Sequence, residues 1–518
     1  MNLNIEDKKE LLFVTVISIA LVAYYINYNM HLGIYCSDVY VYLLNALYFA
    51  GTNVHSTRSI YLSPVLSFLT SLIFRLGFVD KAAIFIMTGI FAVIGNIGMY
   101  LLLRLRLDKM LSICGTVIYA CLALNLAWLA NGSLDIPAAG ITIWIAYLSV
   151  LATKKNPKYF TLVLPLLVIG FFTRYTVAMI LAPLILYYLL EKSFKIERTD
   201  LKYLLIGLAI AIILAAIILE TVNIMGNGFF GFDSLLSSSV QGNLGSTHDN
   251  SYNPDLTYYL VNMGNFISAS NTTFVAKTPA LNGPTILSGL IFVILIAGTL
   301  LWARRSEFKL SREKIIGIAL CLIALVTFNQ FTSAITILLV FLGLLLIGKD
   351  SENKFAYFML CWILVYLIFQ SYYIVKVNRY IIPIFAPLVY FIMMGVEEIN
   401  NKITRKNILP IILIVLFLIQ GFAFVYTIEE TNEFNAPEMM TDYIKENVDN
   451  WSDIKIGNYN IRPYYWFLGP NSPGIASYDT QRIIDSNVSY YISNHKLNLT
   501  NYTEVIQIEN LYLYKKNV

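Results

Sequence analysis

Long apolar stretches recur along the whole chain and are separated by short polar segments that contain most of the lysines and arginines. A bilayer core about 30 Å thick is crossed by about 20 apolar residues in a helix, and lipid forces each crossing segment to satisfy its own backbone hydrogen bonds. The sequence therefore predicts an all-α polytopic membrane bundle with about thirteen transmembrane helices. The predicted spans are 11–28, 82–103, 110–129, 135–152, 160–173, 175–190, 203–223, 285–303, 315–329, 333–348, 355–375, 380–396 and 408–427.

Composition excludes the soluble classes of protein. The chain has 518 residues, of which 58% are hydrophobic and only 13% are charged. A soluble domain carries about 25% charged residues, so this chain cannot coat a water-soluble surface. The net charge of +4 is too small to indicate a nucleic-acid partner. The five cysteines form no CxxC pair, so neither a disulfide framework nor a paired metal site is expected.

Residues 61–78 are apolar enough to span, but Ser63, Ser67 and Ser71 would share one helical face, as in an amphipathic helix on the membrane surface. Positive charge decides between these interpretations. If this segment does not span and the N-terminus is cytoplasmic, 22 of the 36 lysines and arginines lie inside, seven lie in outer loops and seven lie in the tail. The positive-inside rule favours this topology, with an extracytoplasmic C-terminus and a cell-membrane location.

We predict a transmembrane module over 1–427, with external loops 29–81 and 224–284, and a small extracytoplasmic α/β domain over 428–518. The tail alternates like strands in four places and has helical spacing in one. Its last two strands are joined at Glu509-Asn510, as in a hairpin. The expected helix covers 436–449, and the expected strands cover 453–459, 489–493, 504–508 and 511–515.

The candidate functional residues are charged or titratable groups that fall at the predicted outer ends of the spans or in the outer loops. They are Asp38, Asp135, Arg174, His248, Lys376 and Arg379. We expect them to converge on an outward-facing cavity at the membrane surface. A carboxylate there can deprotonate an attacking hydroxyl, and a fixed arginine or lysine can hold a phosphate leaving group.

Four of the six candidates also have a structural explanation. Asp38 and Asp135 stand where a helix N-cap would be. Arg174 can snorkel to the interface, and a lone loop histidine such as His248 is usually solvated. The spans themselves contain few ionisable groups, which disfavours a pump or an ion-coupled transporter.

Short motifs in a fixed order resemble the GT-C superfamily of membrane glycosyltransferases, and most closely the family 39 group of protein O-mannosyltransferases and lipid A aminoarabinose transferases. The resemblance starts at SDVYVYLLNAL, where an acidic residue follows the first span. Its other parts are SPVL (63–66), LLLRLR (101–106), NGSLDIPA (131–138), TRYT (173–176), NRYIIP (378–383), YIKEN (443–447) and YYWFLG (464–469). The high content of Ile, Asn and Lys favours a prokaryotic source.

The resemblance implies an inverting transferase that uses a polyprenyl-phosphate sugar, such as a dolichyl-phosphate hexose, as donor. Asp38 would be the catalytic base, while Arg174, Lys376 and Arg379 would be candidates for the donor phosphate. Asp135 would shape the site, and His248 would be a further substrate-binding candidate. Many members carry an acidic pair in the first loop. Here Ser37 and Val39 flank Asp38, so no metal ligand is assigned, and the need for a divalent metal stays open.

Two other functions remain open at this stage. A lipid or polysaccharide transporter, or an assembly scaffold without transferase activity, is compatible with the number of spans. Polymer ligation from a diphosphate-linked glycan would keep the enzyme class and change the donor. The acceptor hydroxyl can belong to a protein, a lipid or a lipid-linked glycan, and membrane lipids are the expected surroundings.

Overall fold

The computed structural model describes residues 5–52, 64–224, 252–305, 311–402, 407–477 and 479–517. The chain divides into two compact units, each described here by itself. The first, called the helical unit, comprises Met1–Tyr24, Thr88–Leu129 and Leu134–Ile428. The second, called the mixed unit, comprises Tyr25–Met87, Ala130–Ser133 and Glu429–Val518.

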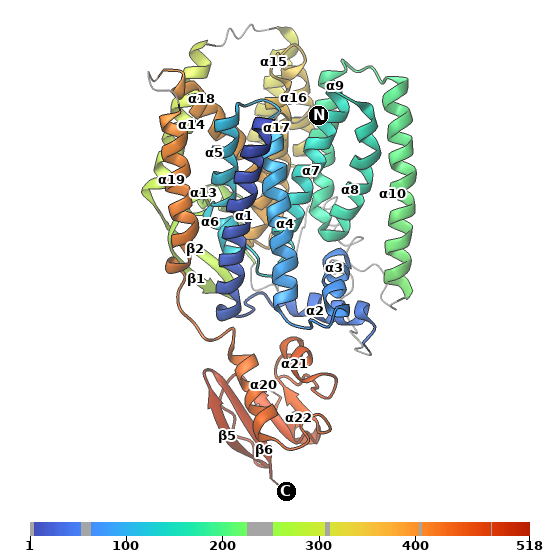
Figure 1. The fold of residues 1–518 in the computed structure, drawn as a ribbon, viewed down its shortest axis with the longest axis vertical. Coiled ribbons are helices and arrows are strands. Elements are labelled where there is room, and N and C mark those ends of the chain that lie inside the picture. Colours follow the sequence, from blue (N-terminus) through green and yellow to red (C-terminus); the bar gives the residue numbers. More distant parts are fainter. Residues whose placement is uncertain are drawn as a thin grey trace. The chain divides into compact units, whose positions relative to one another are not determined.

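The helical unit consists of long apolar helices that lie side by side (Figure 1). Every predicted span falls on helical structure, and eight helices of the described chain are long and apolar enough to cross a membrane. The all-α membrane bundle is thus confirmed. Its elements, two of which begin or end in the mixed unit, are α1 (Ile5–Leu32), α4 (Ala82–Leu103), α5 (Lys109–Ala120), α6 (Ala123–Ala127), α7 (Asp135–Lys154), α8 (Phe160–Thr173), α9 (Leu181–Glu191), α10 (Arg198–Ile224), α14 (Ile286–Arg305), α15 (Arg312–Val326), α16 (Ser333–Gly348), α17 (Lys354–Tyr372), α18 (Phe385–Asn400) and α19 (Ile408–Ala423), with short 3₁₀ turns η1 (Pro157–Tyr159), η2 (Tyr175–Ile180), η3 (Asn378–Ile384) and η4 (Phe424–Thr427).

One predicted span, 110–129, is not a continuous helix, because α5 ends at Ala120 and α6 starts at Ala123. The break frees the carbonyl of Cys121, which accepts a hydrogen bond of 2.6 Å from the side-chain amide of Gln420 in α19. The same amide nitrogen donates to the carbonyl of Ile267 at 2.9 Å. A buried carbonyl without a partner is costly, so a polar residue in an otherwise apolar helix makes the interruption possible.

Glycines allow the closest helix contacts. A Cβ placed on Gly298 of α14 would lie 2.3 Å from the Cα of Gly395 in α18, and a Cβ on Gly95 of α4 would lie 3.0 Å from the Cα of Gly140 in α7. Small residues at a crossing let two backbones approach in a medium that offers no hydrophobic drive for association. These contacts fix how α14 packs on α18 and how α4 packs on α7.

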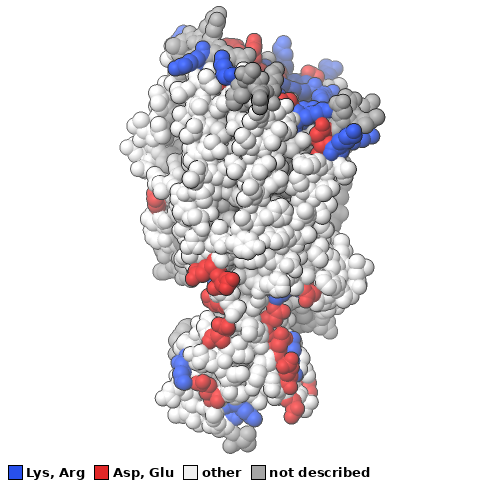
Figure 2. Space-filling model, turned by 60° about the vertical axis from the view of Figure 1, so that its left-hand side comes forward, with Lys and Arg blue, Asp and Glu red and all other residues white. Residues whose placement is uncertain are grey.

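Positive charge gathers at one end of the helical unit (Figure 2). Ion pairs show that connections far apart in the sequence meet there. Lys109 lies 3.7 Å from Glu10 near the start of α1, and Lys154 at the end of α7 lies 2.9 Å from Glu191 at the end of α9. The clusters that the sequence assigns to one membrane side therefore do share one end of the bundle. Their assignment to the cytoplasm remains a prediction.

Residues 252–284 have regular structure where only an outer loop was predicted. They form the short helices α12 (Tyr258–Val261) and α13 (Met263–Ile267) and an antiparallel hairpin of β1 (Ala269–Val275) and β2 (Thr278–Pro284). The hairpin turns at Ala276 and Lys277, both in the left-handed region with φ of 48° and 61°. Alanine and lysine are uncommon in such turns, which usually contain Asn or Gly, so the sequence did not predict the hairpin.

The mixed unit contains α2 (Asp38–Ala50) and α3 (Pro64–Arg75) together with the C-terminal segment. That segment forms a four-stranded sheet in the order β3-β4-β6-β5, in which only β3 and β4 are parallel. The predicted β5–β6 hairpin is confirmed, with Glu509 at φ 51° in its turn. The C-terminal elements are α20 (Ala436–Asn447), β3 (Ile456–Asn458), α21 (Ile461–Leu468), α22 (Thr480–Asp485), β4 (Tyr490–Ser493), β5 (Tyr502–Ile508) and β6 (Leu511–Lys516).

Helix α3 buries polar side chains and exposes apolar ones, unlike a typical surface helix of a soluble protein. Its polar residues Ser67, Thr70 and Ser71 are buried, whereas Phe68 and Leu72 are 45% and 41% exposed. At 12 residues the helix is about 18 Å long and cannot cross a bilayer core of about 30 Å. Its length and its exposed apolar face fit a helix that lies in the membrane interface, as the charge distribution had indicated.

Candidate active site

Asp135 is the first residue of α7, and its buried carboxylate contacts two arginines from other parts of the helical unit. Arg174 follows α8 in an extended conformation, and its guanidinium forms an ion pair with Oδ1 of Asp135. Nε of Arg379, in η3, lies 3.6 Å from Oδ2 of the same carboxylate. We call Asp135, Arg174 and Arg379 the arginine–aspartate cluster. The structure thus brings together three of the residues that the sequence had singled out.

Aromatic rings hold both guanidinium groups in place. The Arg174 guanidinium lies 4.8 Å from the ring centre of Tyr380, and that of Arg379 lies 4.8 Å from the ring of Trp128 and 5.8 Å from Tyr380. Such cation–π contacts orient a planar guanidinium without consuming its hydrogen-bond donors. The cluster is therefore preorganised by groups that leave donor capacity for a ligand.

A second layer fixes the aromatic partner of Arg379. Nε1 of Trp128 donates to Oδ1 of Asn378 at 3.1 Å, and Nδ2 of Asn378 donates to the carbonyl of Pro279 in β2. The hairpin that the sequence missed therefore supports the site. Trp128 and Asn378 were also not among the candidates. Asn378 lies in the NRYIIP motif, whereas nothing in the sequence marks Trp128.

Two guanidinium groups contact the one carboxylate of Asp135 in this cluster. The side chain of Asp135 is 2% exposed, while those of Arg174 and Arg379 are 17% and 13% exposed. Charges interact strongly where water is largely excluded, and planar guanidinium groups match the oxygens of a phosphate. Such an arrangement can bind one monoanionic phosphodiester.

Lys376 precedes η3, and its side chain binds backbone carbonyls at the C-terminal end of α17. Its ammonium donates to the carbonyls of Gln370 at 3.2 Å, Ser371 at 2.6 Å and Tyr373, which are the last carbonyls of α17. Three acceptors match the three ammonium hydrogens, and a cation at this position also favours the helix dipole. Burial lowers the pKa of Lys376 to about 8, and Asp255 opposes that shift weakly. Lys376 thus points to α17 although it lies close to Arg379 in the sequence.

Asp38 belongs to the mixed unit and is the first residue of α2. Its Oδ1 lies 3.3 Å from Nη1 of Arg462, which also contacts Oγ of Ser37 at 3.2 Å. The Asp38 side chain is 31% exposed and that of Arg462 is 43% exposed. Ser37, not Asp38, occupies the N-cap position of α2. Arg462 was not among the candidates, although it lies two residues before the YYWFLG motif.

Helix α21 holds Arg462 against the first external segment of the same unit. Trp466 stacks on Phe74 of α3 with ring centres 5.9 Å apart, and Phe467 meets the edge of Tyr40 of α2 at 6.0 Å. Tyr464 of the same helix is fully buried in the core of the C-terminal sheet. These contacts make α21 a rigid support for the arginine that touches Asp38.

His248 lies outside the described residues. In the part of the chain that the structure does describe, no three His, Cys, Asp or Glu side chains gather as ligands of one metal ion. Asp38 and the arginine–aspartate cluster lie in different units, so each is defined by its own contacts.

Known proteins share both sequence and fold with this chain. Residues 62–219, from the start of the α3 region to α10, match the family model described as dolichyl-phosphate-mannose-protein mannosyltransferase. Over these residues the chain is similar to that family. This similarity agrees with the superfamily that the short motifs resemble. A search of curated protein sequences finds no match.

Solved structures agree on the fold over nearly the full length. ArnT from Cupriavidus metallidurans bound to undecaprenyl phosphate is 9% identical with a TM-score of 0.61, and the alignment covers 97% of each chain. The apo state of ArnT gives a TM-score of 0.53 at 11% identity, again over 97% of each chain. The apo oligosaccharyltransferase of Archaeoglobus fulgidus is 12% identical with a TM-score of 0.50, over 94% of this chain and 69% of that one.

Proposed function

We propose that this glycosyltransferase moves a sugar from a polyprenyl-phosphate donor to a hydroxyl acceptor on the outer face of the membrane, with inversion at the anomeric carbon. The observation that carries the proposal is the arginine–aspartate cluster, in which Arg174 and Arg379 flank the buried Asp135. A donor of this class carries a phosphodiester, whose oxygens match the planar donor groups of the two guanidinium groups. The bound undecaprenyl phosphate of ArnT and the dolichyl-phosphate-mannose of the matched family support the same donor class.

The reaction is a single in-line displacement. The acceptor oxygen forms a bond to the anomeric carbon while the bond from that carbon to the phosphate oxygen breaks, and polyprenyl phosphate leaves with the electron pair. The carboxylate of Asp38 takes the proton of the acceptor hydroxyl. Arg174 and Arg379 stabilise the charge that grows on the departing phosphate.

Asp135 and Arg462 act as positioning residues in this proposal. Asp135 pairs with both guanidinium groups and keeps them from repelling each other before the donor arrives. Arg462 contacts Oδ1 of Asp38 through one nitrogen at 3.3 Å, and this contact would orient the carboxylate toward the acceptor hydroxyl. The acceptor can be a protein, a lipid or a lipid-linked glycan.

The decisive experiment supplies the purified full chain with a radiolabelled polyprenyl-phosphate hexose and membrane extracts. Asp38→Asn is expected to lower transfer about 10²- to 10⁴-fold, the usual contribution of a general base. The matched control is Asp442→Asn, which removes a carboxylate from the exposed face of α20 and should transfer at the wild-type rate. The anomeric configuration of the product, read by NMR, tests inversion.

Two outcomes would contradict the proposal. Equal transfer by wild type and Asp38→Asn would remove Asp38 as the base. Transfer only from diphosphate-linked donors would change the donor class, and lipid or glycan movement across liposomes without any sugar transfer would favour a transporter.

A further inference from the structure

A second charged site lies at the opposite end of the helical unit from the arginine–aspartate cluster. It is a hollow of about 370 Å³ among the α4–α5 connection, the ends of α7 and α9, and the start of α17. Helix α7 carries Asp135 at one end and Lys154 at the other, which separates the two sites by about 28 Å along the helix axis. The hollow therefore belongs to the other membrane face and takes no part in the proposed reaction.

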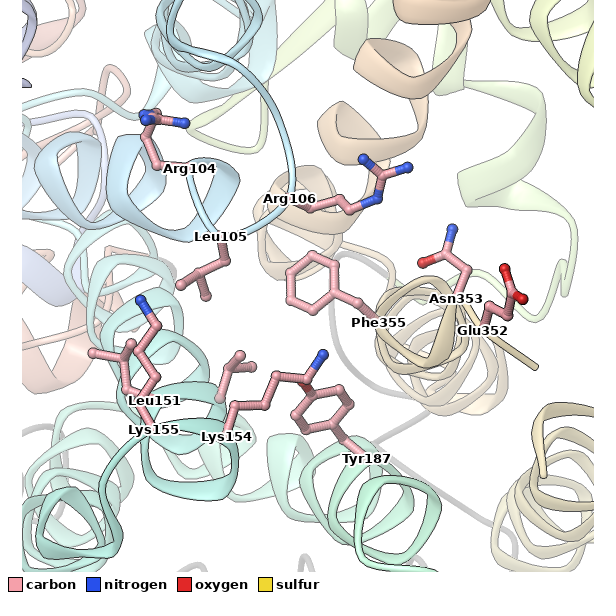
Figure 3. A pocket seen from close by; sticks show the side chains of 11 residues that line it. Arg104, Leu105, Arg106, Leu151, Lys154, Lys155, Tyr187, Glu352, Asn353 and Phe355 are labelled. Carbon is pink, nitrogen blue, oxygen red and sulfur yellow. The ribbon is translucent and has the colours of Figure 1, made fainter. Parts of the chain in front are cut away.

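Four cations and one carboxylate line the hollow, namely Arg104, Arg106, Lys154, Lys155 and Glu352 (Figure 3). Carboxylates outside the lining balance two of the cations in part. Glu191 lies 2.9 Å from Lys154, and Glu397 lies 4.0 Å from Arg106. Lys155 has no carboxylate of the described residues within ion-pair distance, and it is exposed. Lys155 therefore gives the hollow a positive charge that a ligand can neutralise.

The start of α17 adds to this field. Asn353 caps the helix, with its Oδ1 accepting from the backbone N–H of Ala356 at 3.3 Å, and both Asn353 and Phe355 line the hollow. The N-terminal end of a 19-residue helix carries a partial positive charge. Cationic side chains and a helix N-terminus thus line one open hollow, which is an arrangement that binds phosphate.

An apolar groove adjoins the basic hollow. This groove of about 320 Å³ runs between α14, α17 and α18, and Asn353 lines both volumes. Its walls include Leu295, Leu360 and Phe391, and Trp302 lies near the end of α14 that is closest to the basic face. A charged hollow that shares the wall residue Asn353 with a mostly apolar groove, whose one carboxylate is Glu398, fits an amphiphile with a phosphate head and a hydrocarbon chain. A soluble phosphate would use only the hollow.

We propose that the hollow and the neighbouring groove together bind an anionic phospholipid, with its head-group phosphate among Arg106, Lys154 and Lys155 and an acyl chain in the groove. Basic pockets between membrane helices on the positively charged face bind such head groups. The Trp302 indole lies where aromatic side chains mark the interface between head groups and chains. The lipid stabilises the contact of α17 with α7 and α9 at the face opposite to the proposed chemistry.

The test measures lipid binding to the full chain by native mass spectrometry, with cardiolipin as the anionic probe and phosphatidylcholine as the zwitterionic one. Wild type should retain cardiolipin preferentially. Arg106→Gln/Lys155→Gln should weaken cardiolipin binding about 30-fold, because each cation near the surface contributes about a factor of five. Lys158→Gln/Lys202→Gln removes the same charge from the same face outside the hollow and should change binding less than threefold.

A second variant separates the lipid from a soluble phosphate. Ala356→Phe fills the groove without changing any charge, and it should weaken cardiolipin binding while radiolabelled inorganic pyrophosphate binds as before. Unfolding temperatures of all variants are measured in detergent, so that loss of fold is distinguished from loss of the site.

The proposal is overturned by equal cardiolipin binding in wild type and Arg106→Gln/Lys155→Gln. It is also overturned if both double variants lose binding equally, which would indicate general surface attraction. If pyrophosphate binds tightly and Ala356→Phe retains cardiolipin, the ligand is a soluble phosphate and the lipid assignment fails.

Discussion

Asp135 and Asp38 are both carboxylates at the first position of a helix, yet their surroundings differ. Asp135 is 2% exposed and contacts two guanidinium groups, whereas Asp38 is 31% exposed and contacts one nitrogen of a half-exposed arginine. The carboxylate of Asp135 is buried between two arginines, whereas that of Asp38 is partly open to solvent. In the proposed reaction Asp135 would hold the guanidinium groups in place, and Asp38 would act on the acceptor hydroxyl.

The largest expected difference between the two carboxylates is in stability. Asp135→Asn leaves two buried guanidinium groups without their shared counter-charge and should lower the free energy of unfolding by about 3–5 kcal/mol. Asp38→Asn breaks a pair that is open to solvent and should cost about 1 kcal/mol or less. Thermal unfolding of both variants in the same detergent measures this contrast. Similar losses at the two positions would remove the distinction between anchor and base.

A smaller effect, on the KM for the lipid donor, is expected when the arginines of the cluster are replaced by lysine, which keeps the charge but not the planar guanidinium group. Arg174→Lys and Arg379→Lys remove the planar guanidinium that stacks on Tyr380 or Trp128. Charge-assisted hydrogen bonds contribute about 1.5–3 kcal/mol, so each variant should raise the KM for the lipid donor about 10- to 100-fold. Steady-state kinetics over a range of donor concentrations checks this. The control Arg482→Lys, in α22, should leave KM unchanged, and an unchanged KM in the cluster variants would place the donor phosphate elsewhere.

The last expected effect concerns Lys376, a buried cation of the connection between α17 and η3. Burial lowers its pKa to about 8 in the folded chain, against an ordinary value of 10.5. Between about pH 8 and 10.5 the unfolded chain binds more protons at this residue, so the contribution of Lys376 to stability rises with pH across that window. Unfolding midpoints of wild type and Lys376→Met at pH 7.5, 9 and 10 isolate this contribution. A difference between the two proteins that does not change with pH would show that Lys376 has an ordinary pKa.

The bundle was predictable because every segment that crosses lipid must satisfy its own backbone hydrogen bonds as a helix. The positions of the charged residues then indicated which connections lie on the same membrane side. The grouping of basic connections at one end followed from counting cations alone. The break after Ala120 was not predictable, because its hydrogen-bond partner Gln420 lies 299 residues from Cys121. The hairpin of β1 and β2 was missed because Ala276 and Lys277 are not the usual residues of its turn.

The site was predictable in its charged members and not in their supports. Asp135, Arg174 and Arg379 stood out as charges at the ends of apolar spans, and the structure joins them. Trp128 and Arg462 act through partners that are hundreds of residues away in the sequence, so no local pattern identifies them. Lys376 shows the opposite case, since its sequence position resembles that of Arg379 while its ammonium satisfies helix carbonyls.

The hydrogen bonds of the Gln420 side chain connect α19 to the residues around Arg379 as well as to the helix break after Ala120. Its two acceptors, Cys121 and Ile267, begin two separate paths to the same arginine. From Cys121 the chain continues through α6 to Trp128, whose indole stacks on Arg379. From Ile267 it continues through the β1–β2 hairpin to Pro279, whose carbonyl accepts the hydrogen bond from Asn378. A sideways shift of α19 in the bilayer would therefore move the stacking partner of Arg379 and that partner's own support together. Under the proposed function, donor affinity would therefore depend on α19, which supports the surroundings of Arg379 without being part of the arginine–aspartate cluster.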